Sequence, residues 1–221
     1  ILTSSFLVTA KLAGIAYILA VVLGIVVGVV AAVNHGKWVD SALMTISVFG
    51  ISAPAFWIAI ILQIVICLKF NLLPLSGIDS FKSFILPGIA LGTRYAASIA
   101  RITRTSMLDV LSQDYIRTAE AKGLKGWVVT IKHALRNALI PIITIAGSDL
   151  GNILTGSVLV ESVFSIPGIG KMLVDSINTR DLPIVQGGVM YIAVICVIMY
   201  LVVDLLYTVV DPRIRLGKES S

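Results

Sequence analysis

The residues of this chain that could do chemistry are few, and their spacing excludes the commonest reactions. Residues 165–172 come close to the loop GxxxxGK followed by Ser or Thr, whose backbone amides cradle a phosphate, but the first glycine and the final hydroxyl residue are missing. His35 and His133 lie far apart, and Cys67 and Cys196 lie inside apolar runs without a CxxC or Cys/His pattern. The sequence therefore predicts neither nucleotide hydrolysis by that mechanism nor a metal site.

Three charged residues interrupt long apolar runs, and a charge in such a place is a functional hypothesis by default. Asp149 lies at the centre of its run, flanked by Ser148 and with Asn152 close to the same helix face. This polar patch either lines a water-filled path or pairs with a neighbouring helix. Arg94 either extends to the membrane surface or faces the same path. Asp204, near the end of the last run, is expected to pair with a basic residue of a cytoplasmic loop.

Composition indicates which solvent surrounds these residues. The chain has 221 residues, of which 57% are apolar and 13% charged, and its mean hydropathy is +1.01. Soluble domains carry about 25% charged residues, so the composition argues against a soluble enzyme. Disorder is excluded because it requires low hydrophobicity. We interpret the net charge of +5 as a sign of membrane topology and expect no nucleic-acid partner.

Apolar runs of about 20 residues predict an all-α integral membrane protein with five spans. Residues 101–137 carry seven basic and three acidic residues, a net charge of +4, whereas residues 161–183 carry −1. Because Lys and Arg favour the cytoplasmic side, the first segment and the C-terminus are predicted inside and the second segment outside. Residue 1 then lies outside, and a cytoplasmic N-terminus requires one more span before it. The predicted segments are spans at 6–33, 42–68, 84–104, 139–159 and 184–210, a cytoplasmic loop at 105–138 and an external loop at 160–183.

The predicted cytoplasmic loop is long enough to fold by itself. Asp114 is expected to cap a helix at 115–122, and Gly123 to end it in the left-handed conformation. Small Ala119 and Ala121 leave room for a partner, so this unit is either a docking element for a soluble protein or an amphipathic loop resting on lipid. A second helix is predicted at 126–139, before Pro141, with one apolar face made of Trp127, Ile131, Leu135 and Ala138.

Two further patterns concern packing and the external side. In residues 160–183, Pro167 and Gly168 precede a short amphipathic helix at 169–177, which would shape the external mouth of a path; the alternative is a simple connecting loop. Glycines spaced four apart allow helices in lipid to approach closely, and this spacing joins Gly24 with Gly28, Gly88 with Gly92, and Gly147 with Gly151.

The predicted cytoplasmic loop also resembles a known family. Residues 114–123 (DYIRTAEAKG) and 133–141 (HALRNALIP) resemble the EAA loop of ABC-importer permease subunits, most of all the peptide/nickel branch. The match extends over roughly residues 5–216 and includes similar stretches at 105–109, 161–170 and 204–213. Where the general EAA pattern has a Glu six residues before the Gly, this chain has Arg117, and its Glu is Glu120. The general Ile-x-Leu-Pro ending is also absent.

The resemblance implies a type I ABC importer transmembrane domain (MetI-like fold) in a prokaryotic cytoplasmic membrane, with five of its six spans in this chain. It implies partners: a second homologous permease subunit, two ABC ATPases that bind ATP and Mg, and an extracytoplasmic substrate-binding protein, with no cofactor in this chain. The implied function is import of di- or oligopeptides by alternating access, or of nickel or a metal chelate. An ion-coupled secondary transporter and an intramembrane enzyme are further alternatives. The implied ATPase-coupling residues are Asp114, Tyr115, Arg117, Thr118, Ala119, Glu120, Ala121, Lys122 and Gly123.

Overall fold

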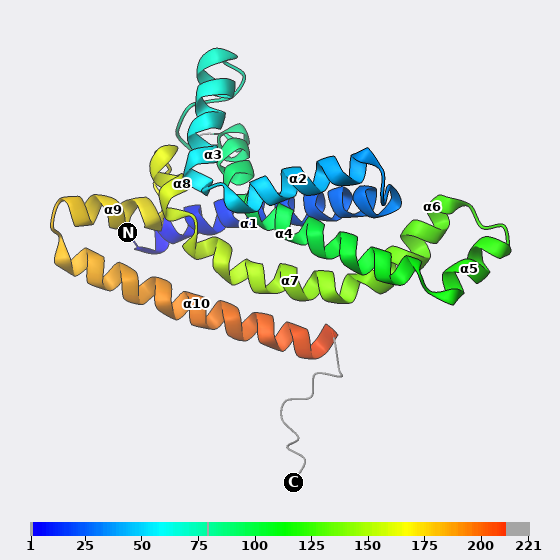
Figure 1. Cartoon of the computed structure of the whole chain (residues 1–221). Helices are drawn as coiled ribbons and strands as arrows, with labels where there is room; N and C mark the ends of the chain where they lie inside the picture. Colours follow the sequence, from blue (N-terminus) through cyan, green and yellow to red (C-terminus); the bar gives the residue numbers. More distant parts are fainter. Residues whose placement is uncertain (1, 79, 211–221) are drawn as a thin grey trace, which may run out of the picture.

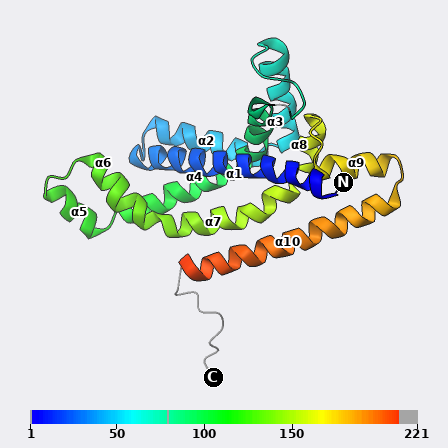
Figure 2. The same cartoon turned by 180° about the vertical axis from the view of Figure 1, so that it is seen from behind.

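The computed structural model describes residues 2–78 and 80–210, and the elements in this part of the chain are all helical (Figures 1 and 2). Besides α-helices they include a 3-10 helix, η2, and two π-helical stretches, η1 and η3. In chain order they are α1 (Leu2–Val33), α2 (Trp38–Ser52), α3 (Ala55–Leu62), η1 (Gln63–Lys69), η2 (Phe81–Phe84), α4 (Ile85–Leu111), α5 (Asp114–Ala121), α6 (Gly126–Val128), η3 (Val129–Leu135), α7 (Arg136–Thr155), α8 (Val158–Val163), α9 (Ile169–Asn178) and α10 (Leu182–Val210).

The centre of the bundle is the long contact between α1 and α4, with α7 packed beside both (Figure 1). Two glycines of α1 let these helices approach each other, as the spacing predicted. A Cβ on Gly24 would come within 2.7 Å of Ile99 Cβ, and a Cβ on Gly28 would collide with Thr103. Larger side chains at these two positions would therefore separate the helices that form the core.

The second predicted span, 42–68, is wrong as a single helix. The chain bends by 107° between α2 and the helix formed by α3 and η1, and this second arm projects away from the bundle (Figure 1). The bend lies at Ala53 and Pro54, which are both extended, with ψ angles of 130° and 136°. Proline has no N–H to donate and disfavours the helical conformation of the residue before it, so the helix ends there.

The predicted helix at 126–139 continues directly into the predicted fourth span. Residues Gly126–Leu154 form one continuous helix, and Pro141 lies inside it. A proline removes only one helical hydrogen bond, and neighbouring helices commonly compensate for this in membrane proteins. Here α4 and α10 pack against α7. The second helix of the predicted cytoplasmic loop and the fourth span therefore form one continuous rod.

The buried face of this rod differs from the predicted one because residues 129–135 are π-helical. Val129, Ala134 and Ala138 are buried, with a spacing of five and then four residues. A π-helix closes its hydrogen bonds five residues apart, so it shifts the face by one residue. Trp127 and Ile131, which belong to the predicted apolar face, are 68% and 50% exposed.

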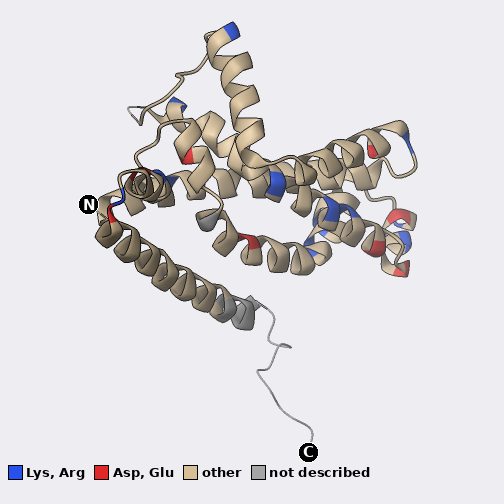
Figure 3. Ribbon diagram, turned by 60° about the vertical axis from the view of Figure 1, so that its left-hand side comes forward, with Lys and Arg blue, Asp and Glu red and all other residues tan. Residues whose placement is uncertain are grey.

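Three described helices are long and apolar enough to cross a membrane, namely Leu2–Val33, Gly126–Leu154 and Leu182–Val203, and the bent pair makes a fourth if it counts as one span. Helix α4 is more polar because Arg94 and Arg101 lie within it, so the count of five spans stays a prediction. Helices α5 and α9 lie at opposite ends of the bundle (Figures 1 and 2). Charged residues gather at the α5 end (Figure 3).

Candidate functional site

The predicted docking element is a separate short helix, α5, placed beyond the ends of α4 and α7 (Figure 1). Its C-terminal end forms as predicted. Gly123 has a φ of +76°, its N–H donates to Glu120 O at 2.8 Å, and the N–H of Leu124 donates to Ala119 O at 3.4 Å. This pair of bonds is the Schellman motif, which favours glycine at the left-handed position. Gly123 therefore sets the direction in which the chain leaves α5.

The expected cap at the start of α5 is wrong. Gln113 is the N-cap residue, with φ −76° and ψ 149°, and no side chain caps the helix. Asp114 lies in the first turn itself. A carboxylate there interacts favourably with the positive end of the helix dipole, instead of accepting the orphan N–H groups as a cap does.

One face of α5 packs on the chain's own core. Ile116 is 1% exposed and Ala119 is 7% exposed, in the same apolar cluster as Met107 and Val129. Ala119 therefore packs against its own chain and offers no room for a partner, contrary to the sequence-based expectation. The other predicted coupling residues are exposed: Asp114, Tyr115, Arg117, Thr118, Glu120, Ala121, Lys122 and Gly123.

Exposed apolar side chains follow α5 along the chain, and the sequence did not indicate them as contact residues. Leu124 is 41% exposed, Trp127 is 68% exposed and Ile131 is 50% exposed. The hydroxyl of Tyr115, itself 44% exposed, accepts a hydrogen bond from Asn137 Nδ2 at 3.0 Å. Exposed aromatic and aliphatic side chains beside charged ones are typical of surfaces that bind other proteins.

A second candidate site is a polar cavity between α4 and α7. Its volume is about 580 Å³, and it brings together three residues predicted for a translocation path, Arg94, Asp149 and Asn152. The fourth, Ser148, is not among the lining residues, and its hydroxyl donates to Ile145 O at 2.8 Å. The side chain of Asp204 lies outside the described part of the chain. The cavity is lined by Ile51, Arg94, Tyr95, Ser98, Arg101, Asp149, Asn152 and Gly156.

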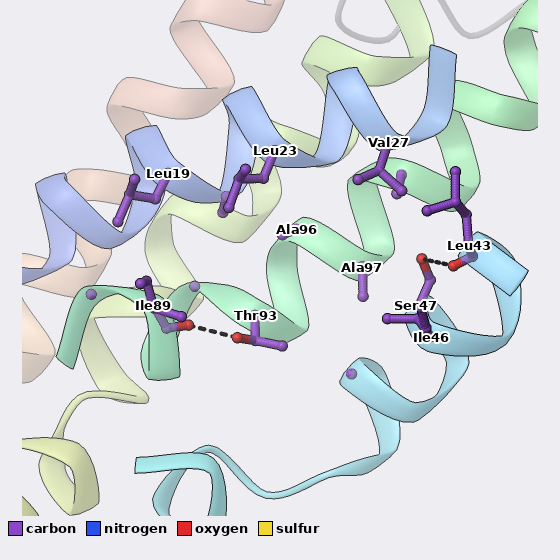
Figure 4. A pocket seen from close by; sticks show the side chains of 15 residues that line it. Leu19, Leu23, Val27, Leu43, Ile46, Ser47, Ile89, Thr93, Ala96 and Ala97 are labelled. Atoms are coloured by element: carbon purple, nitrogen blue, oxygen red, sulfur yellow. Dashed lines mark hydrogen bonds between the residues drawn. The ribbon is translucent and has the colours of Figure 1, made fainter. Parts of the chain in front are cut away.

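A groove of about 220 Å³ on the other side of α4, between α1 and α2, has the opposite character (Figure 4). Leu19, Leu23 and Ile46 are typical of its aliphatic lining. The two hydroxyl groups in its lining both donate to backbone carbonyls of their own helices: Ser47 donates to Leu43 O at 2.9 Å, and Thr93 donates to Ile89 O at 2.6 Å. This groove suits an acyl chain or an apolar helix and not a polar solute.

A buried carboxylate that the sequence did not single out organises the end of the bundle near α9. Glu161 is fully buried, and its Oε1 accepts hydrogen bonds from the hydroxyls of Thr9 and Ser157, each at 2.8 Å. Its Oε2 accepts from the backbone N–H groups of Gly170 and Lys171 at 2.9 and 3.1 Å. These are the second and third N–H groups of α9, in the first turn, where a helix binds an anion best.

Glycines make room for this carboxylate. A Cβ on Gly168 would collide with Glu161 Oε2, and a Cβ on Gly170 would lie 2.6 Å from Val158 Cα. The predicted helix at 169–177 is confirmed as α9, and Thr9 of α1 accepts a hydrogen bond from Ile169 N at 2.9 Å. Residues 161–170 thus connect α8 with α9, and the contacts of Glu161 and Ile169 with Thr9 connect both helices with α1.

An ion pair joins α2 to the end of α4 nearest α5. Arg104 Nε lies 2.6 Å from Asp40 Oδ1, and its second nitrogen lies 2.7 Å from Asp40 Oδ2. The N–H of Gly36 donates to Asp40 Oδ2 at 3.2 Å, and His35 Nδ1 lies 3.1 Å from the same oxygen. The Asp40 side chain is 5% exposed, so this pair is shielded from solvent.

We expect Asp40→Ala to lower the free energy of unfolding by about 3 kcal/mol, because it leaves the guanidinium of Arg104 half-buried and unpaired. Thermal unfolding in detergent would measure this change. The double variant Asp40→Ala, Arg104→Leu should recover part of the stability, since no unpaired charge remains. If the stability losses of the single variants Asp40→Ala and Arg104→Leu simply add in the double variant, the two residues do not interact.

Comparison with known proteins identifies the family. The family described as "Binding-protein-dependent transport system inner membrane component" matches residues 24–216. The glutathione transport system permease protein GsiC of Escherichia coli strain K12 is 44% identical over 214 residues, which cover 97% of this chain and 70% of that protein. The dipeptide transport system permease protein DppB of Bacillus subtilis strain 168 is 45% identical over 219 residues, which cover 99% and 71%.

Two solved structures share the fold at 16% sequence identity. One is the inward-facing MetNI methionine ABC transporter, with a TM-score of 0.75 over 95% of this chain and 96% of the other. The second is an amino acid ABC transporter with histidines, with a TM-score of 0.71 over 93% and 92%. The predicted MetI-like fold of a type I ABC importer is therefore confirmed, and this chain belongs to the family of binding-protein-dependent transport system inner membrane components.

Proposed function

We propose that this chain is the permease subunit of an ATP-driven importer that moves di- and oligopeptides across the cytoplasmic membrane by alternating access. The observation that carries the proposal is the polar cavity of about 580 Å³ between α4 and α7, inside an otherwise apolar bundle. Arg94, Asp149 and Asn152 would line the path there. The names of two relatives, a glutathione and a dipeptide permease, support a peptide as the cargo.

The exposed face of α5 would couple this path to ATP hydrolysis in partner subunits. The helix is held to the bundle by Ile116 and Ala119, and it ends at Gly123 in a fixed direction. It therefore fits the coupling helix of an importer, which inserts into a groove of an ATPase that binds ATP and Mg. A second homologous permease would complete the path, and an external binding protein would deliver peptide at the α9 end.

Uptake into proteoliposomes tests this function. The chain would be reconstituted with the second permease and ATPases of its own system, and supplied with its binding protein, ATP and a labelled dipeptide, glutathione or Ni²⁺. We expect ATP-dependent accumulation of a peptide. Accumulation of Ni²⁺ alone would identify the metal branch of the family and contradict the peptide assignment.

The proposed topology of five spans makes a direct prediction. Lys125→Cys, in the turn after α5, should react with a membrane-impermeant maleimide only from the cytoplasmic side. Asn178→Cys, at the end of α9, should react only from outside. The physical reason is the bias of Lys and Arg toward the cytoplasm. Labelling of both positions from the same side would contradict the topology.

A further inference from the structure

The charged residues of the polar cavity stand in an order that suits one end of a peptide. Arg94, Ser98 and Arg101 are spaced four and three residues apart on α4, so they share one face of that helix. Both arginines are exposed in the single chain. Asp149 of α7 lines the same cavity. Two positive charges and one negative charge therefore face a single space.

Arg94 attracts Asp149 across the cavity, but these charges make no direct contact with one another. In the part of the chain that the structure describes, no ion pair joins Asp149 to either arginine. Oδ2 of Asp149 is buried and has no hydrogen-bond partner among the described residues. An unpaired charge in an apolar bundle is costly. The arrangement is therefore better suited to a charged solute that passes between α4 and α7 than to holding these helices together.

The volume of the cavity also fits a peptide. Arg94 and Arg101 are separated by about 10 Å along α4, at 1.5 Å per residue, so they mark two successive positions for one carboxylate. Small-molecule sites commonly have volumes of about 300–1,000 Å³, and this cavity has about 580 Å³. Guanidinium groups bind carboxylates through two parallel hydrogen bonds. Arg101 is the one nearer to the α5 end of α4.

We propose that Arg94 and Arg101 guide the C-terminal carboxylate of a zwitterionic peptide along α4 toward the α5 end, while Asp149 faces its ammonium group. This inference rests on the proposed peptide transport and assigns a specificity that the binding protein alone does not provide. It makes the permease selective for peptides with a free carboxylate. It also predicts that the two arginines act on the same group of the cargo.

The test compares a labelled dipeptide with its C-terminal amide in the assembled transporter, each at equal occupancy of the binding protein. We expect the unmodified transporter to import the free acid about tenfold faster than the amide, in line with one hydrogen bond to a charged group. Arg94→Gln and Arg101→Gln should each slow import of the free acid by about the same factor and leave the amide unchanged. Lys37→Gln, in the exposed turn between α1 and α2, is the control for the loss of a positive charge and should change neither rate.

Asp149→Asn tests the other end of the peptide. It should slow import of the dipeptide but not of its N-acetyl derivative, and size-exclusion chromatography should show unchanged assembly. Equal loss of acid and amide import in the arginine variants, with loss of assembly, would overturn the proposal and assign the arginines to subunit pairing. Equal import of acid and amide by the unmodified transporter would overturn it while peptide transport stands. If the unmodified transporter imports neither the acid nor the amide, both the peptide function and this inference are contradicted.

Discussion

A Glu161→Ala variant is expected to lose about 4 kcal/mol of its free energy of unfolding, which is the largest loss of stability that the described contacts suggest. The substitution leaves the N–H groups of Gly170 and Lys171 without their acceptor, and each unsatisfied buried group costs about 1–3 kcal/mol. It also removes the acceptor shared by the hydroxyls of Thr9 and Ser157. Thermal unfolding in detergent would measure the loss, and protease cleavage within residues 160–183 would show where the structure opens.

Two controls separate the carboxylate from its neighbourhood. Glu161→Gln keeps the shape and one acceptor oxygen, so it should retain about half of the stability that alanine loses. Ser162→Ala removes a hydroxyl that donates to Val158 O on the same short helix, at 2.9 Å, and should cost less than about 1 kcal/mol. A Glu161→Ala protein as stable as Ser162→Ala would show that the carboxylate does not hold α1, α8 and α9 together.

An Ala121→Asp variant is expected to insert and assemble in the membrane but to lose at least about 90% of peptide uptake and of substrate-stimulated ATP hydrolysis. Ala121 is exposed on α5, so the new carboxylate does not disturb the fold of this chain. In a packed contact with an ATPase it would be desolvated without a partner, which is costly. Uptake and ATP hydrolysis in proteoliposomes measure both losses.

The neighbouring alanine provides a contrast within the same helix. Ala119→Asp places its charge in the apolar cluster with Ile116, so it should lower the yield of folded protein. Ser41→Asp adds a negative charge to the exposed first turn of α2 and should change neither yield nor uptake. Crosslinking from Glu120→Cys to the ATPase would show the contact directly. Undiminished uptake in Ala121→Asp, without a crosslink, would mean that α5 is not the coupling element.

Features that depend on local chemistry could be predicted from the sequence. The hydropathy of α1 and α10, the left-handed end of α5 at Gly123 and the amphipathic helix α9 all follow from residues that are close together in the chain. The bend at Pro54 has a local cause too, but a proline inside an apolar run either breaks a helix or is tolerated, as Pro141 shows. Only packing decides between these outcomes.

Features that depend on distant contacts could not be predicted. Glu161 meets Thr9 across 152 residues, and Asp40 meets Arg104 across 64. The periodic spacing of apolar residues along the sequence carries no information about such pairs. The π-helical register of Val129–Leu135 likewise follows from packing and displaced the predicted apolar face. The sequence indicated three residues that line the polar cavity, Arg94, Asp149 and Asn152. It missed Arg101, because in the sequence that residue is only one of the seven basic residues of the segment 101–137.

The unbroken rod from Gly126 to Leu154 has a mechanical consequence. Four residues separate its start from the end of α5, and Asp149 lies about 35 Å further along it, at 1.5 Å per residue. A tilt of about 5° at the α5 end, with the rod rigid, would move Asp149 by about 3 Å, comparable to the length of a hydrogen bond. A small tilt at the α5 end would thus make or break a single contact of Asp149 deep in the bundle.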